Sequence, residues 1–267
     1  ARQTRRITDD GAWNSVINGT TDWVYEEEFS TTRLMEWSPQ SDFLAFVRSD
    51  ESQVKAYSMP IYGDGLYPTD YVYKYPKVGE QNSTVSLHLY NLELKRIDRV
   101  ELPLDADGYI PRIVFTGWGS DLAAVTLNRL QNDLKVYRIN PKSRTPRLTL
   151  REQDPRYINN EFINSMRFVP DGIVMLSERD GSTQLYKYGT NGALQQRLTQ
   201  GNWDIISFYG CDSDGNVYYQ AADETPTQRR VLKTTPRGKT TVLAGEAGIN
   251  RASFTQDYSY FINSYSN

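Results

Sequence analysis

The chain has 267 residues, of which 38% are hydrophobic and 12% aromatic, and this composition describes a polar-surfaced β protein better than a helical bundle. Its 30 Lys and Arg against 33 Asp and Glu leave a net charge of −3, so it lacks the overall basic charge expected of a nucleic-acid-binding protein. No apolar run approaches the ~18 residues of a membrane span, and the single Cys211 excludes an internal disulfide and a cysteine-based metal cluster.

The first predicted element is a short helix that carries three adjacent glutamates at positions 26–28. Asp22 is expected to be its N-cap, and the acidic turns suit the positive end of the helix dipole. Adjacent carboxylates repel one another unless a cation shares the site. Neighbouring residues on a helix diverge by about 100°, so Glu27 and Glu28 can both reach one small cation, such as a primary ammonium. The alternative is a solvated acidic turn.

An aromatic residue, a polar turn and an apolar strand recur along the rest of the chain. The aromatic residues Trp118, Phe168, Tyr209 and Phe254 are separated by 50, 41 and 45 residues, the spacing of four-stranded propeller blades. We therefore predict an all-β fold over residues 1–267, a β-propeller with four-stranded antiparallel blades, of which about four to five are present. The strands that follow the turns are expected at 43–46, 122–125, 173–176, 217–219 and 258–261.

A segment rich in tyrosine and proline, residues 52–79, interrupts this repetition. The step from Trp37 to Trp118 is 81 residues, about 35 more than one blade. The extra segment contains six tyrosines with little periodicity, which indicates an arm inserted in a blade. Such an arm is either a contact surface or a segment folded back on its own propeller.

The sequence offers no recognisable hydrolytic machinery. His88 is the sole histidine, and the alternation over residues 85–90 places it on the opposite face of a strand from three apolar residues. No Gly-x-Ser-x-Gly elbow occurs. We therefore expect no catalytic residue, no metal site and no cofactor in this chain, and no peptidase activity from the chain alone. The Asp-x-Asp-Gly strings at 105–108 and 212–215 are interpreted as hairpin turns rather than calcium loops.

Three strings resemble the dipeptidyl peptidase IV family of the prolyl oligopeptidase clan. They are Thr-Asp-Trp-Val-Tyr-Glu-Glu-Glu-Phe at 21–29, Tyr-Pro-Lys-Val-Gly at 75–79 and Ser-Glu-Arg-Asp-Gly at 177–181. The resemblance spans most of the chain. It implies the C-terminal part of an eight-bladed propeller, followed after residue 267 by an α/β-hydrolase domain that carries the Ser-Asp-His triad.

The resemblance also implies roles for the residues of the first string. Glu27 and Glu28 match the pair that holds the free N-terminal ammonium of a peptide, supported by Asp22 and Tyr25, whereas Glu26 is expected to be a solvated bystander. The parent enzyme would remove X-Pro and X-Ala dipeptides, and the propeller would gate access to the hydrolase domain. By the same resemblance, the 52–79 arm contributes to a homodimer, and the protein is exported to a periplasmic or extracellular location.

Two other interpretations remain open at this point. The chain could be a non-catalytic propeller that binds a protein or glycan partner through its aromatic arm. Alternatively, the glutamates could bind calcium, which predicts thermal stabilisation by calcium that is lost when Glu27 is replaced by Gln.

Overall fold

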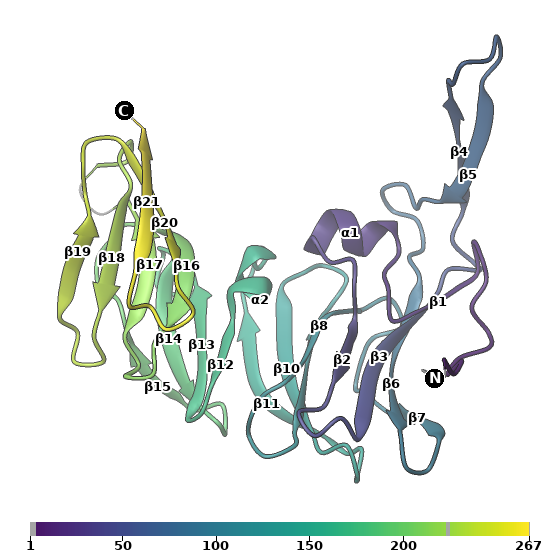
Figure 1. Cartoon of the computed structure of the whole chain (residues 1–267), viewed down its shortest axis with the longest axis horizontal. Helices are drawn as coiled ribbons and strands as arrows, with labels where there is room; N and C mark the ends of the chain where they lie inside the picture. The colour runs from purple at the N-terminus through teal and green to yellow at the C-terminus, as the bar shows by residue number, and fades with distance from the viewer. Residues whose placement is uncertain (1–3, 223–224, 267) are drawn as a thin grey trace. The chain divides into compact units, whose positions relative to one another are not determined.

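The computed structural model describes residues 4–222 and 225–266, which are almost entirely β-structure with two short helices (Figure 1). The chain separates into two compact units, residues 1–160 and residues 161–267. Neither of the described helices has the length and hydropathy needed to cross a membrane.

The first sheet of the first unit is antiparallel and centres on β3, which lies between β6 and the short strands β1 and β2. β3 is buried along most of its length because it has neighbours on both sides. In β6 the predicted alternation is confirmed: Val85, Leu87 and Leu89 are buried, and His88 is half-buried and stacks on Phe46. The strands are β1 (Val16–Asn18), β2 (Met35–Trp37), β3 (Phe43–Asp50), β6 (Thr84–Asn91) and β7 (Arg96–Val100).

The second sheet of this unit has four antiparallel strands in sequence order. Its inner strand β9, with the sequence Leu-Ala-Ala-Val-Thr-Leu, is buried at every position, because small and branched side chains let it pack on both faces. The strands are β8 (Tyr109–Phe115), β9 (Leu122–Leu127), β10 (Asp133–Ile139) and β11 (Pro146–Gln153).

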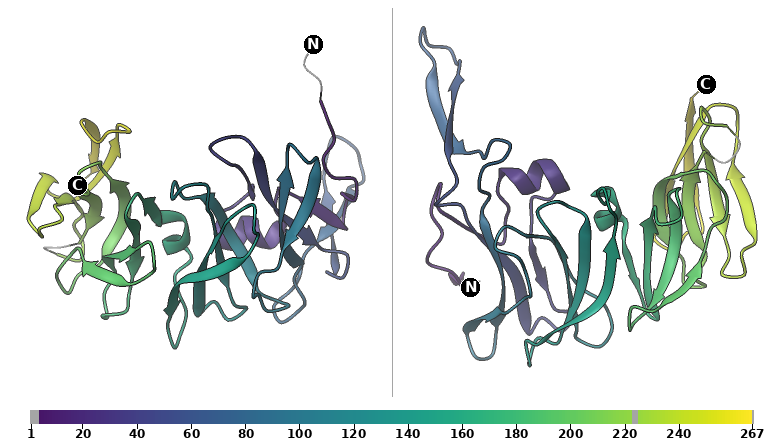
Figure 2. Two further views of the ribbon diagram at one scale, coloured as in Figure 1. Left: turned by 90° about the horizontal axis from the view of Figure 1, so that it is seen from below. Right: turned by 180° about the vertical axis from the view of Figure 1, so that it is seen from behind.

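The Tyr- and Pro-rich segment forms a β-hairpin that projects from the first sheet (Figures 1 and 2). Strands β4 (Ala56–Ile61) and β5 (Thr69–Lys74) pair with each other over their full lengths and with no other described strand. The irregular sequence gave no sign of these strands. Pro60 is tolerated in β4 because each strand of an isolated hairpin has one free edge.

The second unit contains two four-stranded antiparallel sheets and one two-stranded sheet. With the first unit, this confirms the prediction of an all-β chain with four to five blades. The elements are α2 (Glu161–Ser165), β12 (Arg167–Val169), β13 (Gly172–Ser177), β14 (Gln184–Gly189), β15 (Leu194–Arg197), β16 (Ile205–Cys211), β17 (Val217–Ala221), β18 (Arg230–Thr234), β19 (Thr240–Ala244), β20 (Ile249–Phe254) and β21 (Phe261–Ser266).

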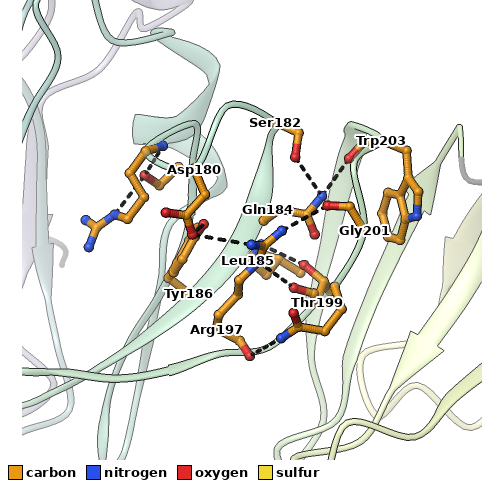
Figure 3. Close-up of polar contacts among 12 residues, drawn as sticks. Asp180, Ser182, Gln184, Leu185, Tyr186, Arg197, Thr199, Gly201 and Trp203 are labelled. Carbon is orange, nitrogen blue, oxygen red and sulfur yellow. Dashed lines mark hydrogen bonds and ion pairs between the residues drawn. The ribbon is translucent and has the colours of Figure 1, made fainter.

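The Ser-Glu-Arg-Asp-Gly string runs from the last residue of β13 into the turn before β14, where a polar network anchors it (Figure 3). Tyr186 donates its hydroxyl proton to the Asp180 carboxylate at 2.6 Å, and Arg197 contacts the same carboxylate. The fully buried Gln184 donates to the main-chain oxygen of Trp203 at 2.6 Å. These contacts join the turn to later segments, so this string serves the architecture of the blade.

The predicted strand at 258–261 is wrong, because β21 begins only at Phe261. Tyr258 has a positive φ of 60° and belongs to a turn. The Asp257 carboxylate organises that turn by accepting hydrogen bonds from the hydroxyl of Thr255 and the main-chain N–H of Ser259. Alternating aromatic residues suggested a strand here, but the ring of Tyr258 packs on the preceding sheet instead.

Candidate functional site

Helix α1 (Trp23–Phe29) has Asp22 as its N-cap, as predicted. Asp22 is extended, with φ −85° and ψ 175°, and its carboxylate accepts a hydrogen bond from the N–H of Tyr25 at 3.1 Å. The hydroxyl of Ser83 donates to the same carboxylate. At the other end, Ser30 takes the left-handed conformation that commonly closes a helix. The seven-residue helix is therefore held at both ends by local geometry.

Tyr25 anchors the helix to the second sheet. Its side chain is 2% exposed, and its ring packs against Phe29 and Tyr109. Its hydroxyl accepts a hydrogen bond from the N–H of Ile110 at 2.8 Å. Burial raises the pKa of the phenol well above its ordinary value, so it stays neutral. With one face of α1 buried in this way, the three glutamates lie on the outside.

The three glutamates are all exposed, and they face different surroundings. Glu28 lines a cavity of about 1000 Å³, and its carboxylate accepts a hydrogen bond from Gln131 at 3.4 Å. Glu27 is not among the residues that line this cavity, and Glu26 lines a second, neighbouring cavity. Glu26 is thus exposed, and it contributes to the wall of a different space.

The cavity beside Glu28 is formed by segments that are far apart in the chain. Its wall includes Trp23, whose ring lies 4.1 Å from that of Tyr75, together with Tyr109 and Arg129. Residues 75–79, the second string of the family resemblance, all line it. No local pattern pointed to Tyr109 or Arg129, because Tyr109 in β8 and Arg129 after β9 reach this wall only through long-range packing beside α1.

Metal binding finds no support around these residues. Across residues 4–222 and 225–266, no group of three or more His, Cys, Asp and Glu side chains is arranged to hold a metal ion. In the string at 212–215, the Asp212 carboxylate accepts hydrogen bonds from the N–H and the side-chain amide of Asn216, which is the chemistry of a turn.

Comparison with solved structures relates the whole architecture to dipeptidyl peptidases. The chain is similar to the crystal structure of Porphyromonas gingivalis dipeptidyl peptidase 4, with 52% sequence identity and a TM-score of 0.94, covering 97% of this chain and 37% of that one. A putative dipeptidyl aminopeptidase IV from Bacteroides ovatus shares the fold, with a TM-score of 0.76 at 22% identity, covering 97% of this chain and 39% of that one.

Curated sequences agree with the structures. The chain is 30% identical over 285 residues to a probable dipeptidyl peptidase 4 of Arthroderma benhamiae and 29% identical over 282 residues to dipeptidyl peptidase 4 of Trichophyton tonsurans. Each match covers 98% of this chain but 36% of the relative, so the chain spans just over a third of their length. The family described as the dipeptidyl peptidase IV (DPP IV) N-terminal region matches residues 1–267. This chain therefore belongs to the dipeptidyl peptidase IV N-terminal region family.

Proposed function

We propose that this chain recognises substrate in a dipeptidyl peptidase IV-type serine exopeptidase that removes X-Pro and X-Ala dipeptides. Glu27 and Glu28 hold the free N-terminal ammonium of the peptide, and the propeller gates access to a hydrolase domain outside this chain. The observation that carries the proposal is the placement of Glu28 on the wall of a 1000 Å³ cavity by a helix fixed at both ends.

The rigidity of α1 gives this grip its chemical meaning. An ammonium held at a fixed position sets the distance from the chain end to the scissile bond, so only the second peptide bond reaches the nucleophile. A primary ammonium offers three donors, which two carboxylates can share. Asp22 and Tyr25 contribute indirectly, because they fix the helix from which both glutamates project.

A chimera tests the role of the glutamates. When this chain replaces the corresponding part of P. gingivalis dipeptidyl peptidase 4, we expect hydrolysis of Gly-Pro-p-nitroanilide. Replacing Glu27 or Glu28 by Gln should lower kcat/KM by roughly 10- to 100-fold, the size of a lost hydrogen bond to a charged group. Glu93→Gln removes the same charge from an exposed position outside the cavity and should have no effect. Equal activity of all three variants would contradict the proposal.

The isolated chain should not hydrolyse Gly-Pro-p-nitroanilide. Ser86 Oγ does lie 2.9 Å from His88 Nε2 on the same strand, which is the contact of a nucleophile and a base. No described carboxylate bonds to the imidazole, and burial lowers the pKa of His88. Activity that disappears in Ser86→Ala would show that this pair is catalytic after all.

We further propose that the β4–β5 hairpin joins two copies of the protein. Both of its strands are mostly exposed, and its tip presents Leu66 and Tyr67 at 97% and 86% exposure. Exposed apolar side chains gathered on one protrusion are typical of a contact surface. The same exposed surface also fits the alternative function, in which the arm binds a partner protein of another kind.

Light scattering of the purified protein tests the arm. We expect a dimer, and we expect the double substitution of Leu66 and Tyr67 by Asp to shift it to monomer at micromolar concentration. The matched control replaces Leu130, which is 73% exposed outside the arm, by the same residue, Asp. This control should leave the mass unchanged. A protein that is monomeric before any substitution would refute self-association through the arm.

A further inference from the structure

A second cavity adjoins the cavity of Glu28 and shares Trp23, Met59 and Tyr73 with its wall. Its volume is about 780 Å³, within the range of ligand sites in proteins. Most of its wall comes from the segment between residues 12 and 23 and from both strands of the β4–β5 hairpin, and Glu26 and Glu51 complete it. The proposed exopeptidase function assigns no role to this space.

Glu51, directly after β3, is the unusual residue of this cavity. It is 7% exposed and lines the space. Its main-chain N–H donates to Ser15 at 2.8 Å, and its main-chain oxygen accepts from Val54 at 3.0 Å, so the backbone is fixed. Within residues 4–222 and 225–266, its carboxylate makes no hydrogen bond or ion pair. Burial raises the pKa of this carboxyl, and the nearby Asp22 raises it further.

Among the described residues, Lys74 is the one positive charge that acts on Glu51, and it lowers the pKa of this carboxyl less than burial and Asp22 raise it. Lys74 lines the same space, but its ammonium donates to the main-chain oxygens of Ser52 at 3.2 Å and Val54 at 2.6 Å. Asp22 is engaged as the helix cap, and Glu26 is exposed. The wall therefore carries three carboxylates against one ammonium. This excess of negative charge on the wall favours a cation supplied from outside.

The rest of the wall indicates what kind of cation fits. Trp13, 70% exposed, contacts Tyr71 edge to face with centroids 5.8 Å apart, and both line the cavity with Met59 and Ile61. Aromatic faces attract organic cations, and apolar walls accommodate a methylene stem. In the described part of the chain these carboxylates do not form a metal-binding group. The space thus suits a charged group on a flexible stem better than a bare ion.

We propose that this cavity binds the basic side chain of a peptide, an arginine or a lysine, with its charged end paired to Glu51 and its stem against Trp13 and Tyr71. The site is separate from the proposed grip on the peptide α-ammonium. It recognises a side chain, and Glu27 and Glu28 are not among the residues of its wall.

Calorimetric titration with a blocked amino acid tests this site independently of the first proposal. The probe is Nα-acetyl-L-arginine amide, which has no free α-ammonium, and the control ligand is the neutral isostere Nα-acetyl-L-citrulline amide. We expect the arginine probe to bind at least roughly tenfold more tightly than the citrulline probe. Glu51→Gln should abolish that preference, whereas Glu93→Gln, an exposed position outside this cavity, should preserve it.

A second variant keeps the test decisive if Glu51→Gln alters folding. Trp13 is largely exposed, so Trp13→Leu should keep the thermal transition of the parent while weakening the arginine probe by about threefold or more. Equal binding of the two probes would overturn the proposal, as would an arginine preference that survives in Glu51→Gln. Calcium binding that requires Glu51 and displaces the arginine probe would assign the cavity to a metal ion instead.

Discussion

Replacing Tyr25 by alanine is expected to lower the free energy of unfolding of the first unit by about 3–5 kcal/mol, the usual cost of deleting a buried aromatic side chain. Two losses combine in this variant. The ring leaves a void beside Phe29 and Tyr109, and the N–H of Ile110 loses its acceptor. The register between β8 and β9 shifts between Tyr109 and Arg112, so the phenol serves Ile110 where the regular ladder is interrupted.

Tyr25→Phe separates these two losses. The ring stays, and only the hydroxyl that accepts from Ile110 is removed, so we expect a smaller cost of about 1–3 kcal/mol for the unsatisfied amide. Amide hydrogen exchange should show faster exchange at Ile110 in both variants. In the chimera with the P. gingivalis enzyme, Tyr25→Ala should also weaken catalysis because α1 loses its anchor. Unchanged exchange at Ile110 would show that the Tyr25 hydroxyl does not protect this amide, which would contradict the anchoring of α1 to β8.

Gly172→Ala should destabilise the second unit by about 3 kcal/mol, the upper end of what overpacking usually costs. Gly172 begins β13 opposite Gly189, and a Cβ at this position would lie 1.8 Å from the main-chain oxygen of Tyr188. That oxygen belongs to the paired strand β14, so no side-chain rotation relieves the contact. The strands must separate, which weakens the β13–β14 ladder.

Urea denaturation followed by amide exchange of β13 and β14 measures this effect. Gly63→Ala is the matched control, because Gly63 lies in the turn of the β4–β5 hairpin with no atom within 4 Å of the added Cβ. It should change the unfolding free energy by no more than about 0.5 kcal/mol. If Gly172→Ala behaves like the control, then the close approach of β13 and β14 is not a constraint on this sheet.

Features that depend on neighbouring residues in the chain were predictable. The helix after Asp22 follows from a capping side chain and the residues it precedes, and the structure shows that bond to the N–H of Tyr25. The blades follow from apolar strands and polar turns at a repeated spacing, and the sheets confirm them. The hairpin strands β4 and β5 escaped prediction because they are largely exposed along their whole lengths, so their side chains do not alternate between core and solvent.

Local pattern alone was therefore enough to establish the β-blade architecture, the acidic helix and its cap, since short-range hydrogen bonds and side-chain alternation govern all three. The surroundings of each carboxylate were decided only by long-range packing. Residues 26 and 28 are two positions apart yet line different cavities, because the walls come from the hairpin and from β8 and β9. Glu51 looked like an ordinary residue after a strand, and its place on a cavity wall became visible only when Trp13, Lys74 and α1 were placed around it.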